Sequence, residues 1–221
     1  QTDGTFKNSY TLPWFEDIKS EDIGAVFFDC DTDGDLDLFV TSGSNEYPKD
    51  SEHYMDRIYV NNGNGDFKKA KDALPKITES SSRVIPGDYD NDGDLDLFVA
   101  GRQVPGSYPM PANSYILKNE TISVDAPIFV NITDQIALDL NQIGMVTDAV
   151  WTDFDNDSDL DLIISGVWMP ITVLENDKGT FKNRTEEFGF ADEVGWWFSL
   201  ANGDFDGDGD DDYIVGNLGL N

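Results

Sequence analysis

Four nine-residue segments of the chain carry the same acidic pattern, D-x-D-x-D-G-x-x-D or a close variant. They span residues 29–37, 88–96, 153–161 and 204–212, and an alternating apolar run such as LDLFV overlaps the end of each or follows it. Their first aspartates lie roughly 50 to 65 residues apart, which is the length of a four-stranded propeller blade with variable loops. The repeat therefore predicts an all-β fold, a β-propeller of four-stranded antiparallel blades, in one segment over residues 1–221.

The spacing of the aspartates predicts a cation in each segment. Two like charges about 4 Å apart repel by about 4 kcal/mol at an effective dielectric constant near 20, so crowded carboxylates need neutralising. Ca²⁺ takes six to eight oxygen ligands, which alternate side chains of a curled loop can supply while the glycine permits the bend. We expect about four Ca²⁺ ions, one per loop. In the third loop Ser158 replaces the glycine, so this site is predicted to be the weakest.

The expected metal ligands are the five alternating aspartates of each loop, the seventh position offering its backbone carbonyl. They are Asp29, Asp31, Asp33, Asp35 and Asp37; Asp88, Asp90, Asp92, Asp94 and Asp96; Asp153, Asp155, Asp157, Asp159 and Asp161; and Asp204, Asp206, Asp208, Asp210 and Asp212. An EF-hand would carry a glutamate at the twelfth position. That position is Val40, Val99, Ile164 or Val215, and the residues before it alternate as in a strand, so the loops are predicted to lie in β-hairpins.

The charge balance excludes some partners. The net charge is −30 with 44 acidic residues, which argues against nucleic acid, whose partners need a basic surface. No apolar run approaches the 18 residues of a membrane span, so membrane insertion is not expected.

Exposed acidic loops bind calcium usefully at millimolar concentrations, which favours an extracellular, cell-surface or periplasmic location. The single Cys30 lies inside the first loop and is expected to be a small packed residue rather than a reactive thiol.

Each repeat is expected to contribute four strands. In the first, GAVFF enters the metal loop, LDLFVTS leaves it, and DRIYVNN and DFKKA complete the blade. The segment before each loop is apolar on both faces, which predicts an innermost, fully buried strand. GTFKN at residues 4–8 repeats GTFKN at residues 179–183, so the chain is expected to hold three complete blades, one orphan outer strand and one inner pair. The alternatives are a small ring closed by residues 4–8 and two copies that associate to complete a ring.

With these loops and strands the chain resembles the FG-GAP/VCBS repeat family, whose blades also occur in integrin α-subunit propellers. GRQVPGSYPMPANSYILKN, SGVWMPITVLEND and GWWFSLANGDFDGDGDDDYIVGNLGLN more narrowly resemble the propeller part of secreted ASPIC/UnbV-type proteins of Bacteroidetes. The resemblance implies an extracytoplasmic propeller, usually of about seven blades, with calcium in its hairpin loops and no established catalysis.

No catalytic motif stands out, so a binding module is favoured over an enzyme. The loops between the second and third strands are long in the first two repeats, and long loops on a rigid scaffold often carry function. These long loops predict a face of the propeller that recognises a protein or glycan. The alternative is a glycan-active hydrolase or lyase whose active site lies on the same face. Arg83 is equally expected to pair with Asp148 in the inner strands. The candidate ligand-binding residues are Tyr47, His53, Arg83, Arg102, Tyr108 and Trp168.

Overall fold

The computed structural model describes residues 11–219, which form two four-stranded antiparallel sheets and one six-stranded sheet and confirm the predicted all-β class. The first blade contains β1 (Glu21–Phe28), β2 (Asp37–Gly43), β3 (Arg57–Asn61) and β4 (Phe67–Lys69). The second contains β5 (Ser80–Gly87), β6 (Asp96–Gln103), β7 (Tyr115–Asn119) and β8 (Phe129–Asn131). The third contains β9 (Met145–Thr152), β10 (Asp161–Pro170), β11 (Thr172–Asn176) and β12 (Phe181–Asn183), and the chain continues with the pair β13 (Val194–Gly203) and β14 (Asp212–Asn217). The six-stranded sheet consists of the third blade and this last pair, because strand β10 also pairs with β13 at one end.

Each acidic loop joins the first and second strands of its blade, as the alternating pattern after the loop predicts. The hairpins are in matching register, since Phe28 pairs with Asp37 and Gly87 pairs with Asp96 at the loop ends. Short helical turns lie between strands: η1 (Pro13–Asp17), η2 (Glu52–Tyr54), α1 (Thr133–Ile136) and η3 (Leu138–Leu140). No helix in the described part of the chain is long and apolar enough to cross a membrane.

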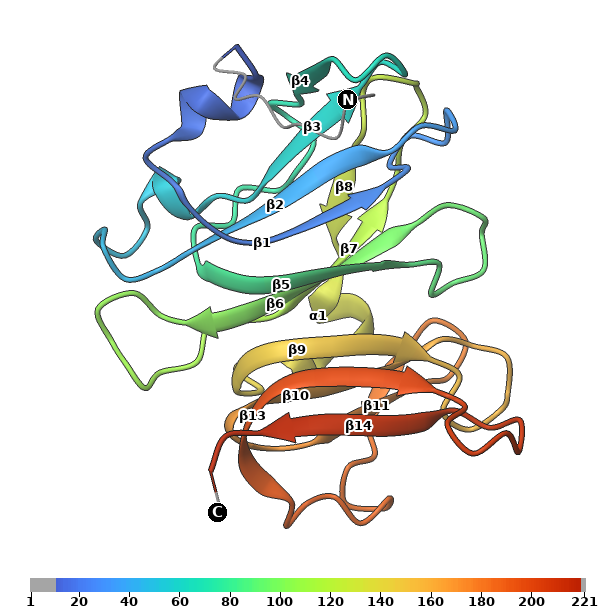
Figure 1. The fold of residues 1–221 in the computed structure, drawn as a ribbon. Helices are drawn as coiled ribbons and strands as arrows, with labels where there is room; N and C mark the ends of the chain where they lie inside the picture. Colours follow the sequence, from blue (N-terminus) through green and yellow to red (C-terminus); the bar gives the residue numbers. More distant parts are fainter. Residues whose placement is uncertain (1–10, 220–221) are drawn as a thin grey trace, which may run out of the picture.

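The blades stack in chain order, and the core lies between them. Figure 1 shows the first blade and the β13–β14 pair at opposite ends of this stack, so the described residues form an open arc. One apolar cluster joins the first and second blades, one joins the second and third, and a smaller one joins the third blade to β13 and β14. The predicted outer strand at residues 4–8 lies outside the described residues, and self-association to complete a ring stays a prediction.

The innermost strands are the expected ones, but the prediction that they are fully buried is wrong. Val84, Ala149 and Leu200 face the preceding blade and are buried, whereas Ala25 holds the same register position in the first blade and is exposed. The next register position faces the following blade and is only partly covered in the first three blades, where Val26, Ile85 and Val150 occupy it; Ala201 occupies it in β13 and is exposed. Burial of these strands therefore depends on the neighbouring blades, and among residues 11–219 no blade covers Ala25 or Ala201.

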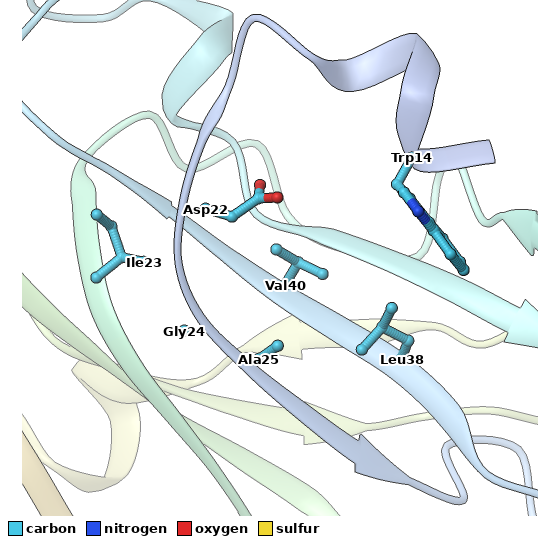
Figure 2. A pocket seen from close by; sticks show the side chains of 7 residues that line it. All are labelled: Trp14, Asp22, Ile23, Gly24, Ala25, Leu38 and Val40. Atoms are coloured by element: carbon cyan, nitrogen blue, oxygen red, sulfur yellow. The ribbon is translucent and has the colours of Figure 1, made fainter. Parts of the chain in front are cut away.

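The free face of the first blade carries a groove of about 390 Å³. Figure 2 shows its lining side chains, which come from β1, β2 and the preceding η1 turn. Trp14 of that turn packs edge-on against Tyr59. The η1 turn is fastened to the outer strands because Asp17 accepts hydrogen bonds from Tyr59 (2.6 Å) and Lys69 (2.6 Å). The turn thus covers the outer half of the face and leaves the inner half open. The groove residues are Trp14, Asp22, Ile23, Gly24, Ala25, Leu38 and Val40.

In the second and third blades, an asparagine at the end of the third strand forms a hydrogen bond to the preceding blade. The side-chain amide of Asn176 donates to the Leu160 carbonyl in its own loop (3.1 Å) and to the Tyr89 carbonyl in the preceding blade's loop (2.9 Å). Asn119 repeats the arrangement with the Leu95 and Cys30 carbonyls. The acidic loops are therefore also the points at which successive blades are hydrogen-bonded.

Candidate functional site

Each acidic loop brings three carboxylates together. In each group the side chains offer oxygens that all lie within 4.8 Å of one another, a separation that a single ion could bridge. The groups combine the first and third loop positions with the fifth in the first loop and with the ninth in the other three. They are Asp29, Asp31 and Asp33; Asp88, Asp90 and Asp96; Asp153, Asp155 and Asp161; and Asp204, Asp206 and Asp212.

Backbone hydrogen bonds hold these carboxylates in place. The first aspartate of each loop accepts the N–H groups of the fifth and sixth residues; Asp88, for example, accepts from Asp92 (3.0 Å) and Gly93 (3.1 Å). In the first three loops the ninth aspartate accepts a hydrogen bond from the N–H of the asparagine in the third strand, as Asp161 does from Asn176 (2.7 Å). The aspartates thus fold the loop as well as offering oxygens, which explains why their spacing is so regular. The seventh-position aspartates, for which we predicted a backbone contribution, lie outside the three-carboxylate groups.

The sixth residue of every loop adopts the left-handed backbone conformation that makes the turn. Gly34, Gly93 and Gly209 have φ values of 94°, 99° and 100°, and Ser158 is held at 79°. A non-glycine residue pays a steric penalty of about 1 kcal/mol in this region. The third loop is therefore built like the others but carries strain that they avoid.

The chemistry of the loops fits a hard cation. Buried carboxylate oxygens without a hydrogen-bond partner occur at Asp31, Asp35, Asp90, Asp94 and Asp96. Burial, opposed by the Asn119 N–H and reinforced by the neighbouring aspartates, raises the pKa of Asp96 to about 7. Burial raises the pKa of Asp161 to about 6 in the same way. Buried anionic oxygens that face one another without a donor are the environment that an ion with several oxygen ligands stabilises.

The second loop already contains a positive charge from the protein. The Lys118 ammonium contacts Asp90 and lies 3.0 Å from Asp92. Lys118 directly precedes Asn119 at the end of its third strand. The residue at the same place is Val60 in the first blade and Glu175 in the third. Sequence reasoning missed this lysine because it lies 22 residues after the loop; only the pairing of β7 with β6 brings it there. The four loops are therefore electrostatically unequal.

Three of the predicted ligand-binding residues have partners within the fold. The rings of Tyr47 and His53 lie 4.3 Å apart, and the Tyr47 backbone carbonyl accepts a hydrogen bond from the buried Tyr54 hydroxyl (2.7 Å). Arg83 forms an ion pair with Asp148 at 3.1 Å, which is the pairing that the sequence allowed. These contacts give three of the candidates, Tyr47, His53 and Arg83, a packing partner within the fold.

The remaining candidates lie on the loop face opposite the acidic loops. Tyr108 is exposed, and the Arg102 guanidinium donates to the Met145 carbonyl (3.2 Å) and lies 5.8 Å from the Phe198 ring centroid. Trp168 lies within β10, and its ring stacks on that of Trp196 with the centroids 5.6 Å apart. The structure thus adds Trp196 and Phe198 to the candidates. The WWF run signals exposed aromatic residues, because alternation along a strand directs one indole away from the packed side.

The Cys30 thiol is a buried structural group, although the Cys30 backbone takes part in the first acidic loop. Cys30 is fully buried, and burial together with the carboxylate of Asp37 raises the pKa of its thiol well above the usual range. The thiol therefore stays protonated and packs as a small apolar group, as expected.

The comparison with known protein families supplies one match. The family model described as FG-GAP-like repeat matches residues 29–99 and 134–215, which include all four acidic loops. No curated protein matches the chain.

Proposed function

The chain belongs to the FG-GAP-like repeat family, and on that basis we propose that it is a calcium-binding propeller scaffold that recognises a protein or glycan outside the cytoplasm. The main support is the set of convergent carboxylates, with unpaired buried oxygens, in hairpins that also join the blades. Ca²⁺ suits these loops better than Mg²⁺, because Mg²⁺ demands a near-ideal octahedron and dehydrates reluctantly. When bound, the ion would offset two of the negative charges of its loop and hold the loop's carboxylates together.

Removal of calcium tests the scaffold role. A ligand at 100 times its dissociation constant adds about 2.7 kcal/mol of stability per site, so chelation is expected to lower the melting temperature markedly. Isothermal titration of the metal-free chain with Ca²⁺ is expected to give about four sites, with Mg²⁺ as the competing ion. An unchanged melting temperature in chelator, or a preference for Mg²⁺, would contradict the proposal.

Recognition on the long-loop face is the second part of the proposal. Exposed aromatic rings and an arginine gather there, and such side chains dominate binding energy at recognition surfaces.

Substitution on the two faces separates recognition from scaffolding. Replacing both Arg102 and Tyr108 by alanine is expected to weaken partner binding while leaving the calcium-dependent melting temperature nearly unchanged. The matched control replaces Asp88 by asparagine, which is expected to lower the melting temperature in calcium. If the double substitution leaves partner affinity intact and loop substitutions abolish it without unfolding the chain, the recognition face is the metal face instead.

A further inference from the structure

Three aromatic side chains and one arginine form a continuous row at the end of the third blade and β13. The Trp168 and Trp196 rings are stacked with centroids 5.6 Å apart and planes 19° from parallel. The Trp196 and Phe198 centroids are 6.0 Å apart, and the Arg102 guanidinium lies 5.8 Å from the Phe198 centroid. We call these four residues the aromatic row. Elements of the second blade, the third blade and β13 meet in it, so it exists only in the folded arc.

The backbone holds Trp168 outward at a cost. Trp168 has a φ of 61°, which is strained for a bulky side chain. It is also the extra residue of a β-bulge, because its neighbours Val167 and Met169 pair with the consecutive residues Trp196 and Gly195. The indole that this bulge displays is 58% exposed. An apolar ring of this size is more stable buried, so both the backbone strain and the exposure oppose folding stability here. Such costs are typical of side chains that are kept for contact with a ligand.

Among residues 11–219, Arg102 is the only arginine that has no carboxylate partner in this range. The other three, Arg57, Arg83 and Arg184, each lie within 4 Å of an aspartate or glutamate. Arg102 is half-buried instead, and the contacts that hold it are the Met145 carbonyl and the Phe198 ring. A guanidinium offers five N–H donors in a rigid fork that matches a carboxylate. The chain has 44 acidic residues, yet none of those described pairs with this partly desolvated guanidinium. Its uncompensated positive charge makes the site suitable for an anionic ligand.

The acidic loops are too distant to keep an anion away. Strand β9 begins at Met145, beside Arg102, and ends at Thr152, next to the third loop. Eight residues at about 3.3 Å each separate the two ends by roughly 25 Å, which is about three Debye lengths at physiological ionic strength. The field of the loops is therefore largely screened at the aromatic row.

We propose that the aromatic row binds an acidic sugar of a glycan, with the sugar carboxylate on Arg102 and a sugar ring on the exposed face of Trp168. The proposal rests on the recognition role argued above and names the ligand class for it. Aromatic faces hold the apolar face of a sugar ring, and the fork of the guanidinium selects the carboxylate. A row of three rings that ends in a cation suits a short oligosaccharide that lies along it.

The test compares two sugars that differ only in charge. The full chain in calcium is titrated calorimetrically with a trisaccharide of glucuronic acid and with the methyl ester of the same trisaccharide. The acid is expected to bind more tightly than the ester by about tenfold to a hundredfold, the range of a charge-assisted hydrogen bond. Arg102→Gln is expected to reduce the affinity for the acid to that for the ester. Trp168→Ala is expected to weaken both sugars equally, and Trp168→Phe, which retains a ring, to weaken them less.

Arg184→Gln is the matched control, because Arg184 pairs with Glu175 and Glu187 on the outer part of the third blade. It is expected to leave both affinities unchanged, and melting temperatures establish that every variant is folded. Equal binding of acid and ester, an Arg102→Gln variant that keeps the preference, or no binding of either sugar would overturn the inference. The broader recognition role fails only if the Arg102 and Tyr108 double substitution also leaves partner binding unchanged.

Discussion

Asn176 offers a direct measure of how strongly the loops join the blades. Its side chain makes three short hydrogen bonds: to the Tyr89 carbonyl of the preceding blade (2.9 Å), to the Leu160 carbonyl (3.1 Å), and from the Gly179 N–H (2.7 Å). The side chain is fully buried. Replacement by alanine therefore removes three bonds at a site where water cannot easily substitute for them.

The matched control is Asn61 in the first blade, which has no described blade before it. Its side chain donates to the Leu36 carbonyl (3.2 Å) and accepts from the Gly65 N–H (3.2 Å), both at the solvent-exposed rim. A buried hydrogen bond contributes about 1 kcal/mol net, so Asn176→Ala is expected to cost about 3 kcal/mol and Asn61→Ala at most about 1 kcal/mol. For a chain of this size these values correspond to melting shifts of roughly 6 to 12 °C and 2 to 4 °C.

The assay is thermal and urea unfolding of both variants in saturating calcium. Asn176→Asp separates hydrogen bonding from lost volume, because the aspartate is nearly isosteric but cannot donate to the two carbonyls. It is expected to destabilise the chain at least as much as the alanine does. If Asn176→Ala costs no more than Asn61→Ala, the bond to the preceding blade contributes nothing and the loops do not fasten the blades.

Three further predictions concern the metal loops. Lys118→Met is expected to raise calcium affinity in the second loop by about tenfold, because it removes a competing cation from Asp90; titration calorimetry measures this, with Lys182→Met as the control for an exposed lysine. In chelator the raised pKa values of Asp96 (about 7) and Asp161 (about 6) mean that the native state keeps protons that the unfolded chain has lost. The free energy of unfolding in chelator is then expected to fall as the pH rises from about 4 to about 7. Calcium needs ionised carboxylates, so in calcium the free energy of unfolding is expected to rise with pH instead. Melting scans that show the same pH dependence with and without calcium would contradict the assignment of these aspartates as metal ligands. Ser158→Gly is expected to stabilise the calcium-loaded chain by up to about 1 kcal/mol by relieving the left-handed turn, a gain that urea unfolding would detect and that a loss of stability would refute.

Features that depend on local spacing were predictable from the sequence. The four acidic loops, their place in hairpins and the strands on either side follow from a nine-residue pattern and a period of two. The left-handed turn at Ser158 follows in the same way, because the loop needs that conformation at its sixth position whichever residue occupies it. The pairing of Arg83 with Asp148 was one of two alternatives in the sequence, since equivalent positions of adjacent inner strands must lie side by side.

Tertiary packing decided the features that join distant segments. Lys118 reaches the second loop through strand pairing, and Asn176 bonds to a carbonyl 87 residues earlier in the chain. Arg102 meets Phe198 only because the second blade, the third blade and β13 converge at one end of the stack. The expectation of fully buried inner strands failed for a related reason: the same apolar residue is buried at Ala149 and exposed at Ala25, according to whether another blade packs against it. Spacing along the chain specifies each blade, but burial and side-chain partners depend on the neighbouring blades, because a β-sheet face is covered only by what lies beside it in space.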